Sequence, residues 1–150
     1  MRIYFDCCCY NRPFDNPSSN RIHDETEAVL SLINRCLRGN GAIIGSTILQ
    51  MEIDKINDPR KKYKVLSLYQ ANTLFIPYTE SIKNRAIELC SKTSIRLMDS
   101  LHIASAESGN ADVFLSTDDK LVRACSKLQL QVRVMNPATY LAEVIANDRR

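Results

Sequence analysis

The chain has 150 residues, of which 45% are hydrophobic and 25% charged, and its formal net charge at pH 7 is +3. This is the composition of an ordinary globular protein, and the absence of Trp with only four Gly disfavours an all-β sandwich with many tight turns. No apolar stretch of about 20 residues could span a membrane, and the six Cys lack the paired spacing of a zinc site, so we expect one domain over residues 1–150 in the cytoplasm, with reduced thiols.

The first third of the chain begins with a β-rich run, Arg2–Phe5, which predicts a strand that ends at Asp6. Residues 7–19 contain Pro, Asn and Ser and are predicted to form a loop. From about Arg21, apolar residues recur at helical spacing until two glycines, Gly39 and Gly41, end the helix.

The middle of the chain alternates short apolar runs with helical patterns. Strands are predicted at 42–45 and 73–77. Helices are predicted at 48–56, where Ser46 or Thr47 is the cap, at 60–71, and after the cap residue Thr79.

The last third repeats the alternation. Helices are predicted at 96–108, followed by a glycine stop, and at 118–127; strands are predicted at 112–116 and 132–135. Pro137 suits the first turn of a final helix. Continuous apolar runs such as Val113-Phe114-Leu115 are typical of strands covered on both faces, so the fold class is α/β: a three-layer α/β/α sandwich with a central parallel sheet of about five strands.

Two carboxylates come directly after predicted strands. Asp6 follows the first strand and Asp118 follows the fourth, so both are expected at the carboxyl edge of the sheet, where ligands bind in open α/β folds. Each also has a simpler explanation, because Asp6 could shape a turn and Asp118 could be a helix cap.

Two further carboxylates lie on apolar helix faces. Glu52 is four residues from both Ile48 and Ile56, and Asp99 is four residues from both Ile95 and Ile103. A carboxylate on a buried face is costly unless it is paired, protonated or bound to a metal ion. The alternatives are that Glu52 lies at the edge of its apolar stripe and that Asp99 only complements the helix dipole.

Four acids from four elements near one sheet edge would repel one another unless a divalent cation neutralised them. One or two Mg²⁺ or Mn²⁺ ions held in this way can activate water and stabilise an in-line displacement at phosphorus. The pattern therefore indicates metal-assisted phosphodiester hydrolysis.

The same residues resemble a known family, the PIN domains, and especially the VapC-like ribonuclease toxins of type II toxin–antitoxin systems. The matching segments are IYFD with Asp6, STILQMEI with Glu52, MDSLHIASA with Asp99 and DVFLSTDDKL with Asp118. Their order and placement fit across essentially the whole chain.

The resemblance implies Mg²⁺- or Mn²⁺-dependent endonuclease activity on RNA, frequent homodimerisation and inhibition by a small antitoxin. It makes Asp6, Glu52, Asp99 and Asp118 the catalytic and metal-binding residues, with Ser116 supporting the site. Asp118 fits the motif better than Asp119, and His102 is interpreted as a neighbour of the site. The chain departs from the family where Cys7 and Cys8, rather than hydroxyl or amide residues, follow Asp6.

A basic segment follows Glu52. Lys55, Arg60, Lys61 and Lys62 could bind the RNA backbone, as could Arg12 after the first strand. The alternative is an ordinary solvated helix face.

Two alternative functions fit parts of the sequence. A PIN-like domain could bind RNA or protein without cleaving, although the full set of four acids argues against it. A phosphoacceptor domain of flavodoxin-like topology would need a pair of acids after the first strand, where only Asp6 stands. No GxxxxGK[ST] motif is present for nucleotide binding.

Overall fold

The computed structural model describes residues 1–150 and contains one sheet of five strands, all parallel, in the order β3-β2-β1-β4-β5. The strands are β1 Arg2–Phe5, β2 Ala42–Ser46, β3 Leu74–Ile76, β4 Val113–Leu115 and β5 Arg133–Met135. The helices are α1 Cys7–Asn11, η1 Arg12–Phe14, α2 Asn20–Leu37, α3 Thr47–Asp54, α4 Pro59–Tyr69, α5 Glu80–Lys92, α6 Leu97–Ser108, α7 Asp119–Ser126 and α8 Pro137–Asp148.

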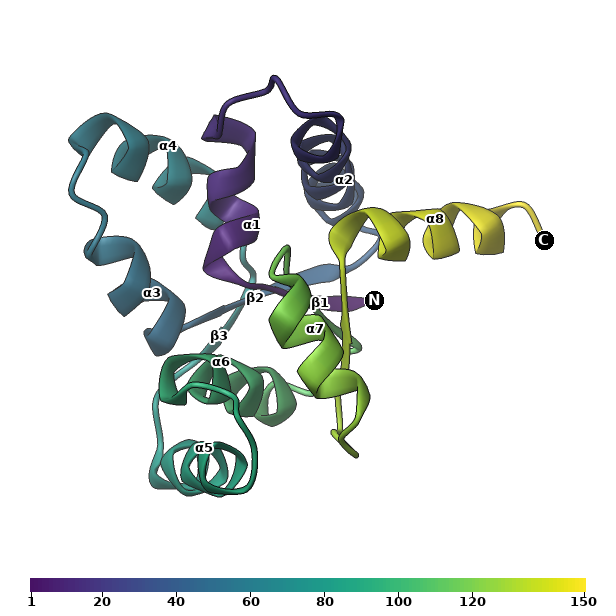
Figure 1. The fold of residues 1–150 in the computed structure, drawn as a ribbon. Coiled ribbons are helices and arrows are strands. Elements are labelled where there is room, and N and C mark those ends of the chain that lie inside the picture. Colours follow the sequence, from purple (N-terminus) through teal and green to yellow (C-terminus); the bar gives the residue numbers. More distant parts are fainter.

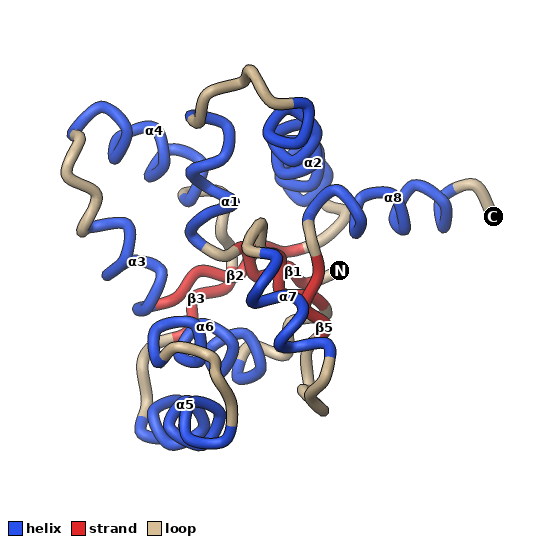
Figure 2. The backbone as a smooth tube through the Cα atoms, viewed as in Figure 1, coloured by secondary structure: helices blue, strands red, loops and turns tan.

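The helices cover both sides of this sheet, which confirms the predicted three-layer α/β/α architecture. Figure 1 shows α1, α2 and α8 on one side of the strands and α5 and α6 on the other. The strands form the middle of the molecule in Figure 2, with helices around them. None of the helices combines the length and the apolar character that crossing a membrane requires.

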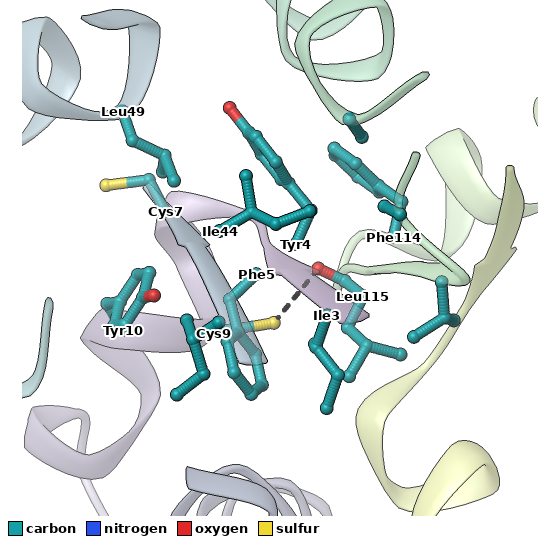
Figure 3. Packing of buried hydrophobic residues seen from close by; sticks show 14 of the residues in the cluster. Ile3, Tyr4, Phe5, Cys7, Cys9, Tyr10, Ile44, Leu49, Phe114 and Leu115 are labelled. Carbon is teal, nitrogen blue, oxygen red and sulfur yellow. Dashed lines mark hydrogen bonds between the residues drawn. The ribbon is translucent and has the colours of Figure 1, made fainter. Parts of the chain in front are cut away.

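The core forms around the central strand because its residues point alternately to the two helical layers. Ile3, Tyr4 and Phe5 are fully buried, and the Tyr4 ring stacks on Phe114 of the neighbouring strand at 5.3 Å between centroids (Figure 3). The Cys9 thiol donates to the carbonyl of Leu115 at 3.3 Å, which ties α1 to β4. Burial of these apolar groups is the main source of stability for such a layer.

The prediction that residues 7–19 form a loop is wrong for their first part. Cys7–Asn11 is a helix whose cap is Asp6, since the Asp6 carboxylate accepts the backbone N–H of Cys7 at 2.8 Å. Cys7, Cys9 and Tyr10 are buried and anchor this short helix to the core. The Pro, Asn and Ser residues that suggested a loop begin only at its end, where Pro13 lies in the first turn of η1.

Helix ends elsewhere follow the chemistry of their caps. The side chains of Ser46, Thr79 and Asp118 each accept a backbone N–H of the first helical turn, as expected. The stop after α6 differs in detail, because Gly109 has an ordinary φ of −84° and Asn110 takes the left-handed conformation with φ 53°. Asn tolerates that conformation better than most residues do.

The topology creates one switch point, between β1 and β4. From β1 the chain builds β2 and then β3 to one side, and it crosses over to add β4 and β5 on the other. At such a point the connections leave in opposite directions and a crevice opens beyond the carboxyl ends of the strands. Asp6 follows β1 there, and Ser116 follows β4.

Candidate metal centre

A cavity of about 390 Å³ lies at the switch point, and all four acids singled out in the sequence line it. The lining residues are Asp6, Cys7, Cys8, Asn11, Glu52, Lys55, Ile56, Asp99 and Asp118. They come from α1, α3, α6 and the residues that cap or follow α1, α3 and α7, so elements far apart in the sequence meet at one edge of the sheet.

Asp6 is the most buried of the four acids, with 7% of its surface exposed. Both carboxylate oxygens are bonded: Oδ1 accepts from the Cys7 backbone, and Oδ2 accepts from the Ser116 hydroxyl at 2.9 Å. Burial raises the pKa of Asp6, while the charge of His102 and the Ser116 hydrogen bond oppose the rise. The carboxylate is therefore held in a fixed orientation by its own helix and by β4.

Ser116 was expected to support the site, and it contacts two of the four acids. Its hydroxyl donates to Asp6 and accepts the backbone N–H of Asp118 at 3.1 Å, so it joins two of the four acids. The half-buried Cys8 adds a longer contact, with Sγ 3.4 Å from Oδ2 of Asp6. A thiol is a weak donor, so the serine is the stronger partner of Asp6.

Glu52 lies in the last turns of α3 and is partly exposed, with 31% of its side chain accessible. Its Oε2 is 3.2 Å from Nε2 of the fully buried His102. Burial alone would raise the pKa of Glu52, but the hydrogen bond and charge of His102 outweigh this and lower it. Glu52 is therefore an ionised acceptor that points inward, as its position among Ile48 and Ile56 suggested.

A chain of buried hydrogen bonds continues behind His102. The Tyr4 hydroxyl is 2.7 Å from Nδ1 of His102 and 2.7 Å from the Ser46 hydroxyl. A carboxylate has no proton to give, so Nε2 of His102 donates to Glu52, while Nδ1 shares a hydrogen bond with the Tyr4 hydroxyl, which is also bonded to Ser46. The central strand, β2 and α6 thus fix the orientation of the Glu52 carboxylate together.

Asp99 lies in the first turn of α6, half-buried, as predicted. Burial and, next, the negative charge of Asp6 raise its pKa to about 6, and Asp118 and Glu52 add to the effect. Burial is thus the main cause of the raised pKa, and repulsion from the neighbouring carboxylates adds to it.

Asp118 is the exposed member of the set and also the cap of α7, with Oδ1 accepting from the Lys120 backbone at 3.0 Å. Asp119 does not line the cavity; it is paired with Arg21 at 2.7 Å. The structure thus separates the two neighbouring acids in the way that the sequence motif suggested.

The donor set fits a divalent cation. Asp6 and Glu52 offer ligand oxygens that lie within 4.8 Å of each other and of a ring nitrogen of His102. Since His102 is hydrogen-bonded to Glu52 through Nε2 and to Tyr4 through Nδ1, the carboxylates are the available ligands. Asp99 and Asp118 line the same cavity but do not belong to this tight group. Carboxylate oxygens at a mostly acidic, water-accessible site are the ligands that Mg²⁺ and Mn²⁺ prefer.

The basic residues divide into two groups. Lys55 lines the cavity and Arg60 makes no ion pair, whereas Lys61 is 3.9 Å from Asp15 and Lys62 is 3.9 Å from Asp54. Arg12, which was considered for RNA binding, pairs with Asp15 at 3.0 Å and faces the buried Glu25 at 3.1 Å.

Sequence reasoning missed one contact of the site. It placed His102 beside Asp99 on one helix face but did not find its bond to Glu52, because that contact depends on how α3 packs against α6. Asn11, in α1, also lines the cavity, and its Nδ2 donates to the Cys7 carbonyl at 3.0 Å.

The sequence matches the family profile described as the PIN domain over residues 20–127, a range that includes Glu52, Asp99 and Asp118. No curated protein matches the chain.

Solved structures share the fold at low identity. The VapBC2 complex of Rickettsia felis bound to a promoter DNA fragment aligns with a TM-score of 0.59 at 16% identity, covering 91% of this chain and 98% of that one. FitAcB of Neisseria gonorrhoeae gives 0.57 at 18%, with coverages of 90% and 97%. A toxin–antitoxin complex of Klebsiella pneumoniae gives 0.58 at 16%, also with 90% and 97%.

Proposed function

The chain belongs to the PIN domain family, and on that basis we propose that it is a metal-dependent endonuclease that hydrolyses phosphodiester bonds in single-stranded RNA. One observation carries the proposal: Asp6, Glu52, Asp99 and Asp118, from four separate parts of the chain, line a single cavity at the switch point of the sheet. A fold gathers four acids at one place at a cost in stability, and a bound cation with an anionic substrate gives a reason for that cost.

The four carboxylates that line the cavity would hold Mg²⁺ or Mn²⁺, and the ligand oxygens of Asp6 and Glu52 lie within 4.8 Å of each other. When bound, the ion supplies a Lewis acid that activates water and stabilises charge on phosphoryl oxygens. The Ser116 hydroxyl holds the Asp6 carboxylate and the Asp118 backbone N–H in fixed positions relative to each other. His102 orients Glu52, so that the carboxylate does not swing away from the cavity.

Cations beside the acidic centre position the RNA backbone. Lys55 lines the cavity and is unpaired, so it contacts the phosphate next to the scissile one. Arg60, Lys61 and Lys62 extend this basic surface along α4. Arg12 is paired with Asp15, so it binds an RNA phosphate only when that ion pair opens. Such contacts bind phosphate without reading sequence.

The structural neighbours support an antitoxin partner, since one of them is a toxin–antitoxin complex. We assign the chain as the toxin of a type II pair that forms a homodimer and is inhibited by a cognate antitoxin. Growth arrest on expression, relieved by the product of a small adjacent gene, is the expected result.

Cleavage of defined RNAs by the purified protein tests the activity. Mg²⁺ or Mn²⁺ should support cleavage, and EDTA should abolish it. Asp99→Asn should lower the rate at least about 100-fold, since it removes a carboxylate from the metal centre. Cleavage that survives both EDTA and this substitution would refute the proposal.

A different outcome would favour the alternative. RNA binding with no turnover in either metal would mark a PIN-like binding domain rather than a nuclease. The discriminating quantity is therefore product formed per enzyme, not affinity.

A further inference from the structure

A second cavity, of about 330 Å³, adjoins the first and shares two acids with it. Its lining residues are Ser94, Ile95, Arg96, Asp99, Asp118, Lys120, Leu121 and Ala124. Asp99 and Asp118 line both cavities, so they form a ridge between them. A linear ligand that crosses this ridge enters both.

The charges around the second cavity are arranged to receive an anion. Arg96 and Lys120 are exposed, and neither makes an ion pair or a side-chain hydrogen bond, although Asp99 and Asp118 line the same cavity. Arg96 stands at the cap position of α6 and Lys120 in the first turn of α7, so both are at the positive ends of helix dipoles. Five of the other eleven arginines, among them Arg21 and Arg85, are paired with acids.

The cavity also has an apolar floor. Ile95 and Leu121 are 5% and 4% exposed, and Ala124 continues their surface. Its volume is at the lower end of the range for small-molecule sites, roughly 300–1,000 Å³, which suits one nucleotide rather than a folded partner. A flat base can rest on the apolar floor while its phosphate meets the cations at the rim.

We propose that the second cavity is a nucleotide subsite, in which Arg96 and Lys120 bind the phosphate of the nucleotide that flanks the scissile linkage, on the side opposite Lys55. The inference rests on the proposed nuclease function and extends it, because it places the RNA on both sides of the carboxylate ridge. Cations that line each cavity, Lys55 in the first and Arg96 and Lys120 in the second, offset the repulsion between the two carboxylates and the RNA backbone.

Binding of a fluorescent single-stranded RNA, measured by anisotropy in Mg²⁺ over a series of salt concentrations, tests the subsite. The measurements use an Asp6→Asn background to prevent cleavage, since Asp6 does not line the second cavity. In that background the double variant Arg96→Gln/Lys120→Gln should raise Kd at least about fivefold. It should also reduce the slope of log K against log salt by about 0.7 per lost phosphate contact.

The matched control is Arg123→Gln/Lys127→Gln. It removes the same two charges from exposed positions at and after the end of α7 that line neither cavity. The control should change Kd less than twofold. Equal effects of the two double variants would overturn the subsite, since the loss would then report net charge alone.

Replacing one phosphate of the RNA by an uncharged methylphosphonate identifies the phosphate that Arg96 and Lys120 bind. RNAs with a single methylphosphonate, moved along the strand, should bind more weakly at one position flanking the cleaved bond, and the Arg96→Gln/Lys120→Gln protein should show no further loss there. Additive losses at every position would overturn the assignment. If the unaltered protein cleaves RNA but the double variant matches its control, only the subsite fails; if the unaltered protein neither binds nor cleaves RNA, the proposed function fails with it.

Discussion

Nε2 of His102 lies 3.2 Å from Oε2 of Glu52, although the two residues are 50 positions apart in the sequence. The contact joins α3 to α6, and it continues through Tyr4 to Ser46 at the end of β2. One acid of the candidate centre is therefore positioned by the interior of the protein and not only by its own helix.

Tyr4→Phe should lower the free energy of unfolding by about 1–2 kcal/mol, because it removes the two buried hydrogen bonds that the hydroxyl makes to Ser46 and His102. Urea denaturation at pH 7 measures the loss. Tyr63→Phe is the control, since Tyr63 is 74% exposed and should give no measurable change. A stability of Tyr4→Phe equal to that of the unaltered protein would mean that the hydroxyl is not part of a buried relay.

Asp99→Asn should stabilise the metal-free protein at neutral pH. The pKa of Asp99 is raised to about 6, so the folded state binds its proton more tightly than the unfolded state does. Stability is then lost as the pH rises from about 4 to above 6, where the folded carboxylate must ionise beside Asp6. Removing that charge should give back about 1–2 kcal/mol after allowance for partial exposure.

Thermal unfolding in EDTA between pH 4 and 8 measures this difference. The gain in Tm for Asp99→Asn should vanish near pH 4 and be full at pH 7. Asp24→Asn is the control, because Asp24 is exposed and makes no ion pair. A pH-independent gain would point to a cause other than the ionisation of Asp99.

Comparing Asp118→Asn with Asp119→Asn should show whether metal binding depends on the carboxylate that lines the cavity or only on the number of negative charges nearby. Mn²⁺ should raise the Tm of the unaltered protein, and Asp118→Asn should lose most of that rise while keeping a good cap residue on α7. Asp119→Asn should keep the rise, because its carboxylate faces Arg21 and not the cavity. The reverse pattern would reassign the fourth acid.

Glu25→Gln should destabilise the protein by about 3 kcal/mol through loss of a buried charge between two arginines. Glu25 is 2% exposed and contacts Arg21 at 3.3 Å and Arg12 at 3.1 Å, the latter without the alignment of a hydrogen bond, and it also accepts from Asn136. Denaturant unfolding should show less than about 1 kcal/mol for the control Asp148→Asn, which breaks only the exposed pair with Arg35. Equal small losses would show that the buried cluster contributes little.

The sheet was predictable from local pattern, because each parallel strand is a short apolar run that needs both faces covered. The presence of the four acids in one cavity was predictable for a related reason, because strand ends and inward helix faces can be recognised from residue spacing alone. Helix α1 was not, since three adjacent cysteines carry no periodic signal and only the Asp6 cap and the packing of Tyr10 make the segment helical. Contacts between distant elements, such as His102 with Glu52 or Arg21 with Asp119, depend on how the elements pack. The sequence around each residue therefore does not indicate them.

Mn²⁺ binding to the unaltered and the Asp6→Asn proteins, followed by the loss of the electron paramagnetic resonance signal of free Mn²⁺, tests most directly whether the four-acid cavity is a divalent metal centre. We predict saturable binding by the unaltered protein, an unchanged affinity in Asp24→Asn and a reduction of at least about tenfold in Asp6→Asn. Equal affinity in all three proteins, or no saturable binding by any of them, would contradict the assignment of these carboxylates as a metal centre.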